Sequence, residues 1–301
     1  MPRYALVATG PGLGDIDIDI IAGADLGSPD ILAPARACQW RVEETRDTGA
    51  IARRDALRAA IGQCPVDINL VRDDALRRKR LLLADMDSTI IGQECIDEIA
   101  QFAGVGDSVA AITERAMRGE LDFEEALTER VGLLKGLSED ALEKVAAERL
   151  TITPGARELI ATMRHHGAYC ILVSGGFTFF TSRIAATVGF DENRANTLEI
   201  VAGRLTGNPV HPILGREAKR ETLIECTAKF ALPPDATLAV GDGANDLAMI
   251  EAAGLGVAFR AKPLVNQAAD AQVQHGDLRD LLFLQGYRHD EIVAPSRQPT
   301  S

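Results

Sequence analysis

The chain has 301 residues, of which 46% are apolar and 25% charged, a composition typical of a globular protein with a sizeable core. At about 150 residues per domain, this length suggests two domains. The high apolar content and the lack of periodic glycine exclude a disordered or collagen-like chain. The 32 basic and 44 acidic residues leave a net charge of −12, which argues against duplex nucleic acid or an anionic membrane as the main partner.

The cysteines and the start of the chain indicate a reducing compartment. The five cysteines are scattered and lack C-x-x-C spacing, so they predict neither a disulfide framework nor a zinc site. The first apolar run has four residues, too few for a signal peptide. No apolar stretch approaches the roughly 18 residues that a membrane span needs. We therefore expect a cytoplasmic protein.

Residues 1–79 are predicted to form a small α+β domain. Apolar runs at 4–8 and 66–71 predict strands, and the pattern at 53–62 predicts a helix. The stretch between them is punctuated by Pro and Gly, which predicts loops.

Two charged features near this first segment are interpreted as structural, without a functional role. The pairs Asp15-x-Asp17 and Asp17-x-Asp19 are interpreted as loop acids. The basic run 77–80 is short and flanked by acids, so it is interpreted as a solvated linker face.

From residue 81 onward, apolar strands alternate with helices, which is typical of a parallel sheet covered on both faces. Ligands of such sheets lie beyond the carboxyl ends of the strands. We therefore expect Asp85, Ser174 and Asp242 to meet at one functional edge. Strands are predicted at 81–85, 168–174 and 237–242, and helices at 154–165, 177–188, 215–230 and 244–253.

A wholly helical stretch, 93–150, interrupts this alternation directly after the first strand. Such an insertion is a candidate lid over the site. Residues 197–206 predict a hairpin, and the tail 294–301 is expected to be frayed. The helices of the insertion are predicted near 94–104, 106–118, 122–134 and 138–148.

Four motifs at the predicted edge carry the chemistry. Asp85-Met86-Asp87-Ser88-Thr89 places two carboxylates after a buried strand, where a cation or hydrogen bonds must compensate them. Gly241–Asp246 (GDGAND) follows a second strand, and acids converging there would hold Mg²⁺, a hard ion that prefers oxygen ligands. Ser174-Gly175-Gly176 offers a hydroxyl and backbone N–H groups to a phosphate. Lys219 is placed to neutralise phosphate charge.

The order DMDST, SGG, Lys219, GDGANDLAM resembles the haloacid dehalogenase (HAD) superfamily. Over 81–283 the chain is similar to the bacterial phosphoserine phosphatases of that superfamily, also at 94–98, 117–136 and 198–207. The segment 1–79 more weakly resembles the ACT-like module often found in these enzymes.

The resemblance implies an α/β fold: a Rossmann-like parallel HAD core over 80–301, a helical cap at about 93–150, and an ACT-like α+β domain at 1–79. It implies Mg²⁺-dependent hydrolysis of O-phospho-L-serine through an aspartyl-phosphate, the last step of serine biosynthesis. Mn²⁺ stays open as an alternative metal, since it also accepts oxygen ligands.

The resemblance also assigns roles. Asp85 matches the nucleophile and Asp87 the general acid and base. The metal would be held by the Asp85 and Asp242 carboxylates and the Asp87 carbonyl. The remaining matches are Ser174, Gly175, Lys219 and Asn245 as phosphate contacts, Asp246 as a support for Lys219 or a metal-bound water, Glu94 for the substrate ammonium, Arg130 for its carboxylate, and Phe123 as an apolar wall.

A purely structural role stays open for two residues at this point. Glu94 could cap the helix that it begins, and Arg130 could make a surface pair one turn away.

Other functions also stay open. The chain could be a related HAD phosphatase for another phosphorylated amino acid or small metabolite, or a phosphate-accepting module resembling a response regulator. Residues 1–79 could regulate by binding an amino acid, mediate contact in a homodimer, or be inert.

Overall fold

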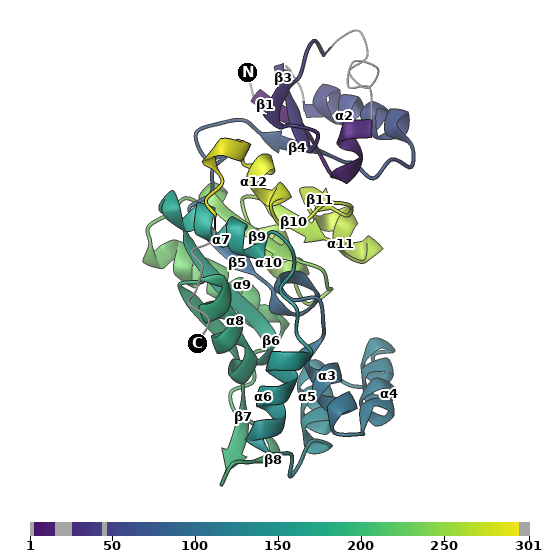
Figure 1. Ribbon diagram of the computed structural model, residues 1–301, viewed down its shortest axis with the longest axis vertical. Helices are drawn as coiled ribbons and strands as arrows, with labels where there is room; N and C mark the ends of the chain where they lie inside the picture. Colours follow the sequence, from purple (N-terminus) through teal and green to yellow (C-terminus); the bar gives the residue numbers. More distant parts are fainter. Residues whose placement is uncertain (1–2, 16–25, 44–46, 295–301) are drawn as a thin grey trace.

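The computed structural model describes residues 3–15, 26–43 and 47–294. The expected loop acids Asp17 and Asp19, and all but the first residue of the tail, lie outside these described residues. In the described part of the chain, the strands form one sheet of four and one of seven. Figure 1 shows the small sheet at one end, the large sheet in the middle and the helical insertion at the other end.

The small sheet is antiparallel, in the order β2-β3-β1-β4. The strands predicted at 4–8 and 66–71 and the helix predicted at 53–62 are confirmed. The sequence pattern does not predict β2 and β3, because β2 is very short and the polar Gln39 and Arg41 interrupt β3. The elements are β1 (Arg3–Thr9), the 3-10 turn η1 (Pro11–Asp15), β2 (Asp30–Ala33), β3 (Ala37–Glu43), α2 (Asp47–Ile61) and β4 (Asp67–Arg72).

Both faces of the small sheet are buried. Leu6 and Trp40 pack in one cluster with Leu57 of α2. Ala5 and Val7, which point the other way because side chains alternate along a strand, pack in the main core cluster together with residues of α12 (Asp280–Leu284). The small sheet is therefore continuous with the core of the large one.

The large sheet has the order β11-β10-β9-β5-β6-β7-β8, and its neighbours are parallel except in the β7–β8 hairpin. The three predicted strands are β5, β6 and β9 at its centre. Strands β10 and β11 were too short to predict from periodicity. The strands are β5 (Leu81–Ala84), β6 (Tyr169–Phe177), β7 (Glu192–Val201), β8 (Arg204–Val210), β9 (Thr237–Gly241), β10 (Gly256–Phe259) and β11 (Ala271–Val273).

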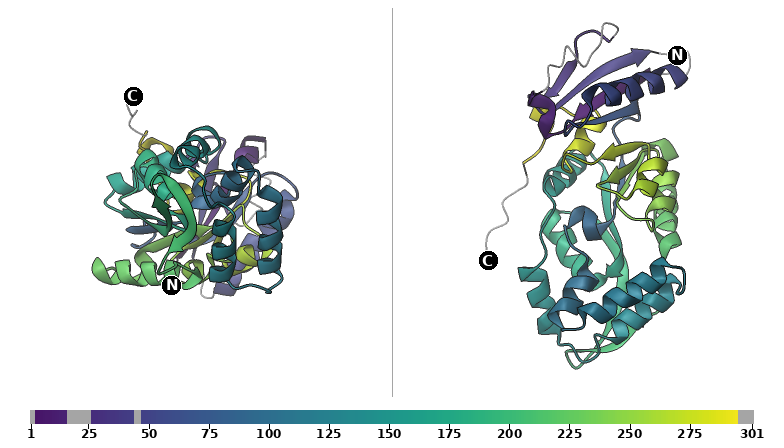
Figure 2. Two further views of the ribbon diagram at one scale, coloured as in Figure 1. Left: turned by 90° about the horizontal axis from the view of Figure 1, so that it is seen from below. Right: turned by 90° about the vertical axis from the view of Figure 1, so that its right-hand side faces the viewer.

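Helices cover both faces of this sheet, as the alternation predicts (Figure 2). Leu82 of β5 packs in the cluster that contains residues of α7 and α8. Its neighbour Leu83 packs in the cluster that contains residues of α9 and α10. These helices and turns are α7 (Ala156–His165), α8 (Thr178–Val188), α9 (Arg216–Lys229), η3 (Pro234–Ala236), α10 (Leu247–Ala252), α11 (Pro263–Ala268) and η4 (His289–Glu291).

The insertion after β5 consists of the expected helices. Its two ends lie side by side at the base, where Gly92 N–H donates to Thr151 O and Thr153 N–H donates to Ile90 O. Asp122 begins one helix with a capping box, which satisfies the first free N–H groups. The elements are the loop segment η2 (Met86–Ile90), α3 (Cys95–Phe102), α4 (Gly106–Met117), α5 (Phe123–Gly132) and α6 (Glu139–Glu148).

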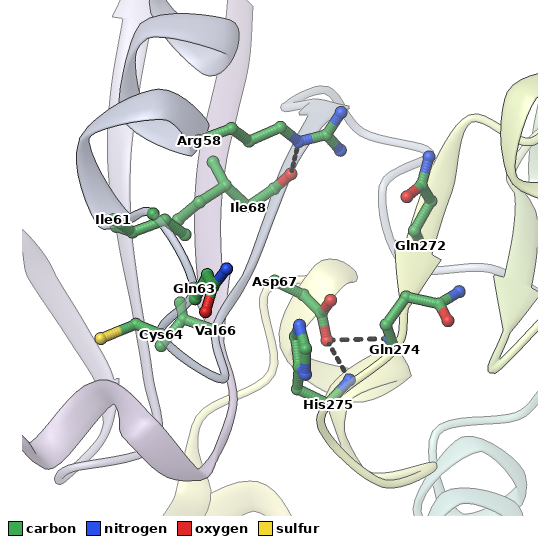
Figure 3. Close-up of a pocket in the computed structure, with 11 residues that line it drawn as sticks. Arg58, Ile61, Gln63, Cys64, Val66, Asp67, Ile68, Gln272, Gln274 and His275 are labelled. Carbon is green, nitrogen blue, oxygen red and sulfur yellow. Dashed lines mark hydrogen bonds between the residues drawn. The ribbon is translucent and has the colours of Figure 1, made fainter.

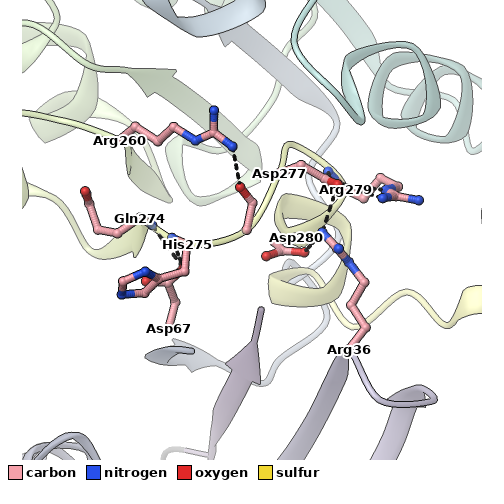
Figure 4. A network of polar contacts seen from close by, with 9 residues as sticks. Arg36, Asp67, Arg260, Gln274, His275, Asp277, Arg279 and Asp280 are labelled. Atoms are coloured by element: carbon pink, nitrogen blue, oxygen red, sulfur yellow. Dashed lines mark hydrogen bonds and ion pairs between the residues drawn. The ribbon is translucent and has the colours of Figure 1, made fainter. Parts of the chain in front are cut away.

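Polar side chains of the small sheet bind the free edge of β11. Asn69 donates to the Gln272 carbonyl at 2.8 Å and accepts from the Gln272 N–H at 2.9 Å. Asp67 Oδ2 accepts from the N–H groups of Gln274 and His275, both at 3.0 Å (Figure 4). These bonds satisfy backbone groups that an edge strand leaves unpaired. A cavity of about 380 Å³ opens beside this junction, and Arg58 is among its lining residues (Figure 3).

The interpretation of 77–80 as a solvated linker face is wrong for two of its residues. Arg77 and Lys79 are buried, whereas Arg78 and Arg80 are exposed. The Arg77 guanidinium donates to Gln39 of the small sheet and to the Leu284 carbonyl of the core. Sequence spacing does not show these partners, because they come from distant parts of the chain.

Candidate active site

Three neighbouring strands bring the predicted residues together. Strands β9, β5 and β6 are adjacent and parallel, so their carboxyl ends meet at one edge. Asp85 follows β5, Asp242 follows β9, and Ser174 lies near the end of β6. Lys219 reaches the same edge from α9, which covers one face of the sheet.

The most buried charges of the site form a chain of three. Lys219 Nζ donates to Asp85 Oδ1 and to Asp246 Oδ1, each at 2.6 Å, and all three residues are buried. Burial and the neighbouring Asp246 raise the pKa of Asp85, although Lys219 opposes that shift. Burial disfavours the charge on Lys219, but its two carboxylate partners outweigh it and raise its pKa. The lysine therefore stays charged.

Carboxylates at this edge can hold a metal ion. One oxygen each of Asp85, Asp242 and Asp246 lie within 4.8 Å of one another. Burial and the charge of Asp246 raise the pKa of Asp242 to about 6, so a cation would relieve a repulsion that the protein alone leaves. An all-oxygen donor set fits Mg²⁺. The resemblance implies the Asp87 carbonyl as a metal ligand, whereas the carboxylate cluster contains Asp246.

The Asp87 side chain takes a separate position. Its Oδ1 accepts from the Cys95 N–H at the start of α3, at 2.8 Å, and its Oδ2 accepts from the Ser174 hydroxyl at 2.9 Å. The loop between Asp87 and the insertion turns at Ser88, whose φ is 55°. Asp87 thus lies between the first turn of the insertion and the end of β6.

The end of β6 differs from the prediction. We expected the strand to end at Ser174 and a helix to begin at Phe177, but β6 runs to Phe177 and α8 begins at Thr178. The pairing of β6 with β7 shifts between Val173 and Phe177. The three residues between them therefore bulge out of the ladder toward the site.

The glycines of this bulge let neighbouring side chains approach the backbone closely. A Cβ on Gly176 would lie 3.0 Å from Ser174 Oγ and 3.1 Å from Asp87 Oδ2. A Cβ on Gly175 would lie 3.2 Å from the Phe123 ring, which the insertion places over the bulge. Phe123 thus lies where a wall of the site was expected, and it also packs against the main core.

Glu94 begins the first helix of the insertion, and Arg130 belongs to its third helix, α5. Glu94 is the N-cap residue of α3, but its side chain makes no capping bond and instead accepts from the Ser88 hydroxyl at 2.7 Å. Surrounding protein atoms and the charge of Asp87 raise the pKa of Glu94 to about 7, although the side chain stays accessible to water. The surroundings therefore disfavour the charged form of Glu94, and a cationic partner would stabilise it.

Arg130 makes the contact one turn away that was left open, with a backbone carbonyl as its partner. Its Nε donates to the Ala126 carbonyl one turn away, at 3.1 Å. Burial lowers its pKa, and the charges of Asp97 and Glu94 oppose that shift. The guanidinium therefore lies within electrostatic reach of Glu94.

The resemblance predicts Asn245 as a phosphate contact, whereas it assigns no role to Thr89 or Asn196. Asn245 is exposed in the loop after β9, and its Oδ1 lies 2.3 Å from where a Gly243 Cβ would be. Thr89 donates to Asp242 Oδ1 at 3.3 Å. Asn196 of β7 is buried and binds the Gly175 carbonyl. Only the folded sheet brings Asn196 to the site.

The fold and the site define a Rossmann-like α/β protein with an acidic cluster and a buried lysine at the carboxyl edge of its sheet. The family model of haloacid dehalogenase-like hydrolases matches residues 82–251. This match covers more than half of the chain, and the chain belongs to that family.

Curated phosphoserine phosphatases match most of this chain. The phosphoserine phosphatase of Streptomyces coelicolor is 46% identical over 242 residues, which cover 80% of this chain and 59% of that protein. The phosphoserine phosphatase of Idiomarina loihiensis is 46% identical over 215 residues, covering 71% of this chain and 96% of that protein. The chain spans between 54% and 59% of the relatives from Streptomyces coelicolor, Mycobacterium tuberculosis and Archaeoglobus fulgidus.

Solved structures share the fold. A HAD family hydrolase from Salmonella enterica serovar Typhi has a TM-score of 0.82 and 30% identity, covering 94% of this chain and 98% of that chain. A substrate-bound phosphoserine phosphatase complex has a TM-score of 0.63 and 41% identity, covering 68% of this chain and 97% of that chain. Within the described residues, we find no helix long and apolar enough to cross a membrane.

Proposed function

We propose that this protein hydrolyses O-phospho-L-serine to L-serine and inorganic phosphate through an aspartyl-phosphate on Asp85. One observation supports the proposal: the Glu94 carboxylate accepts from Ser88 beside Asp87, and the Arg130 guanidinium of the same insertion lies within electrostatic reach of Glu94. The names of the relatives, phosphoserine phosphatases at 42–47% identity, support the same substrate.

In the first step, an Asp85 carboxylate oxygen attacks phosphorus, and the bond from phosphorus to the seryl oxygen breaks. Asp87 gives its proton to that oxygen, so serine leaves as a neutral hydroxyl. The hydrogen bond from Lys219 fixes the Asp85 carboxylate, and the ammonium stabilises charge on the phosphoryl oxygens. The Ser174 hydroxyl and the N–H of Gly175 bind those oxygens.

In the second step, a water oxygen attacks phosphorus and gives its proton to Asp87. The bond from phosphorus to Asp85 breaks, inorganic phosphate leaves, and both carboxyl groups return to their starting states. The same group acts first as acid and then as base, and the bond that it accepts from the Cys95 N–H holds it in one place for both steps.

Mg²⁺ is the proposed cofactor, with Mn²⁺ as an alternative. Asp85, Asp242 and the Asp87 carbonyl would hold it, and when bound it supplies positive charge beside the phosphoryl oxygens. Asp246 orients Lys219, to which it is bonded. Asn245 would contact the phosphate from the loop after β9.

The substrate is recognised at its serine end by the insertion. Glu94 pairs with the ammonium, and Arg130 binds the carboxylate as a two-pronged donor. Phe123 closes the apolar side over Gly175. A second phosphorylated amino acid that carries the same two charges would fit the same groups, and it is the alternative substrate.

We also propose a domain organisation and setting. Residues 1–79 form an ACT-like module, supported by its four-stranded antiparallel sheet with α2 on one face. Residues 80–301 form the phosphatase, with a cap at about 93–150. The protein works in the cytoplasm, and the ACT-like module is the part on which a homodimer would form.

The test is phosphate release from L-phosphoserine, L-phosphothreonine and a sugar phosphate, each with and without Mg²⁺. We expect steady turnover of L-phosphoserine with Mg²⁺ and little without it. A preference for the sugar phosphate would contradict the substrate. A single phosphate transferred per chain, with no further release, would instead indicate a phosphate-accepting module.

A further inference from the structure

We propose that Asn196 is a positioning residue, which shapes the phosphate-binding bulge of β6 and joins it to the start of the helix that carries Lys219. This inference rests on the proposed phosphatase chemistry but not on the identity of the substrate. Asn196 is 1% exposed, and it belongs to β7, which contributes none of the residues assigned above to catalysis or binding.

The bulge leaves backbone groups that the strand ladder cannot pair. Between the pairs Val173–Arg194 and Phe177–Asn196, strand β6 has three residues where β7 has one. Such a bulge leaves the extra residues without ladder partners, and a buried carbonyl without a partner is costly. The Asn196 side chain fills this gap, because its Nδ2 donates to the Gly175 carbonyl at 2.8 Å.

This bond fixes one peptide unit at both of its ends. The Gly175 carbonyl and the Gly176 N–H belong to the same planar peptide. Asn196 holds the carbonyl, and Ser174 Oγ accepts from the N–H at 2.8 Å. Because Ser174 Oγ also donates to Asp87, the orientation of this peptide sets the position of a hydroxyl between the phosphate site and the general acid.

The other side of the carboxamide binds the segment before α9. Leu214 N–H donates to Asn196 Oδ1 at 2.6 Å, and Nδ2 also donates to the Leu214 carbonyl at 3.3 Å. Gly215, the next residue, is the N-cap of α9, which carries Lys219 four residues further on. One side chain therefore fixes both the bulge and the start of the lysine helix.

The bulge of β6 and the start of α9, which Asn196 joins, both lie beneath the cap. A Cβ on Gly175 would lie 3.2 Å from the Phe123 ring, and one on Gly215 would lie 3.8 Å from it. The ring of Phe123 thus rests on both. Moving either segment would change the surface on which the cap closes.

The test compares three variants by kcat and KM on L-phosphoserine and on an aryl phosphate, with thermal unfolding measured in parallel. Asn196→Ala should lower kcat about 10- to 100-fold on both substrates. Both substrates use the phosphate site that Asn196 shapes, and Asn196 does not contribute to the recognition of the serine part. Asn193→Ala is the matched control. Asn193 lies on the same strand and accepts from Thr181, away from the site, so this variant should keep its kcat.

Asn196→Asp separates the two halves of the role. An ionised carboxyl keeps the acceptor for the Leu214 N–H but loses the donor to the Gly175 carbonyl. Burial at this position should raise the pKa of the new carboxyl well above its ordinary value of about 3.9. The activity of this variant relative to the parent protein should therefore be low at pH 8 and should rise at least several-fold toward pH 5.5, where the protonated carboxyl can donate again.

The outcomes separate this inference from the proposed function. If Asn196→Ala keeps its kcat, or if it loses no more than Asn193→Ala at equal unfolding temperature, the positioning role is wrong. A flat activity ratio for Asn196→Asp between pH 5.5 and 8 would also overturn it. The parent protein could fail to hydrolyse phosphoserine and still hydrolyse the aryl phosphate, with a rate that falls in Asn196→Ala. In that case the proposed substrate is wrong and the positioning role stands.

Discussion

Lys219 Nζ donates to Asp85 Oδ1 at 2.6 Å, which joins two residues that lie 134 positions apart in the chain. The same ammonium also binds Asp246. A fully buried lysine with two carboxylate partners is expensive to desolvate, and folding tolerates it because each charge is hydrogen-bonded. The pair fixes the direction of the Asp85 carboxylate before any substrate arrives.

Replacing Asp87 should expose its role as proton donor. Asp87→Asn should severely reduce turnover of phosphoserine, whose alkoxide leaving group needs a proton, and should largely spare an aryl phosphate, whose leaving group does not. The measurement is kcat on the two substrates. Equal losses on both would mean that Asp87 acts mainly by holding Ser174 or the start of α3.

Replacing Arg130 tests how the cap reads the substrate. Arg130→Ala should reduce kcat/KM for phosphoserine by roughly 30- to 1000-fold, about 2–4 kcal/mol, because the substrate carboxylate loses its partner. Arg130→Lys should recover only part of this, since an ammonium cannot form the two-pronged contact.

Phosphoethanolamine, which lacks the carboxylate, is the control substrate for Arg130. The unchanged protein should use it poorly, and Arg130→Ala should lose little further rate on it. Equal harm to both substrates would show that Arg130 supports the cap, consistent with its bond to the Ala126 carbonyl, and does not read the carboxylate.

The sequence predicts the core of the fold because each central strand is an apolar run that ends at a polar residue. Asp85, Ser174 and Asp242 follow directly from that pattern, since parallel neighbours place their ends together. The pattern fails where partners come from elsewhere in the chain. Gln39 interrupts the apolar run of β3 because its side chain accepts from Arg77.

Arg77 should contribute far more to stability than its neighbour Arg78. Arg77 is 7% exposed and donates to Asp73, Gln39 and the Leu284 carbonyl. Arg77→Ala should lower the free energy of unfolding by about 2–4 kcal/mol, because it leaves buried acceptors unpaired. Urea denaturation measures this.

Arg78→Ala is the matched control from the same basic run. Arg78 is exposed and pairs with Glu291 at the surface, so its loss should cost less than about 1 kcal/mol. Similar costs for the two variants would contradict the buried junction between the small sheet and the core.

A carboxyl at this junction should make stability depend on pH. Burial raises the pKa of Asp280 to about 7, although Arg36 opposes the shift. The folded chain thus binds this proton more tightly than the unfolded chain. The free energy of unfolding should therefore fall as pH rises from about 4 to about 7, by up to about 4 kcal/mol from this group.

Two variants isolate that contribution in urea denaturation between pH 5 and 8. Asp280→Asn cannot ionise, so its stability should fall less steeply with pH than that of the unchanged protein. Burial would also raise the pKa of Asp277, but hydrogen bonds from Arg279 outweigh it and lower that pKa. Asp277→Asn should keep most of the original slope, reduced only in part because the charge of Asp277 contributes to the raised pKa of Asp280. The assignment fails if Asp280→Asn keeps that slope too.

Asn196 shows why part of the site escapes prediction. Its importance depends on a register shift between β6 and β7, and an isolated asparagine before a hairpin carries no pattern. The Asp246 carboxylate is a different case. The resemblance assigns it as a support for Lys219 or a metal-bound water, and in the structure it accepts a hydrogen bond from Lys219.

The most direct test of the account follows the phosphoryl group itself. The protein is mixed with L-phosphoserine labelled at phosphorus, in the presence of Mg²⁺, and quenched with acid at successive times. We expect label on the peptide that contains Asp85, approaching one per chain and turning over to free phosphate, and none in Asp85→Asn, which should retain less than about a hundredth of the original rate because an amide is not a competent nucleophile. Turnover of phosphoserine without label on Asp85, or label that stays on the chain, would contradict the account.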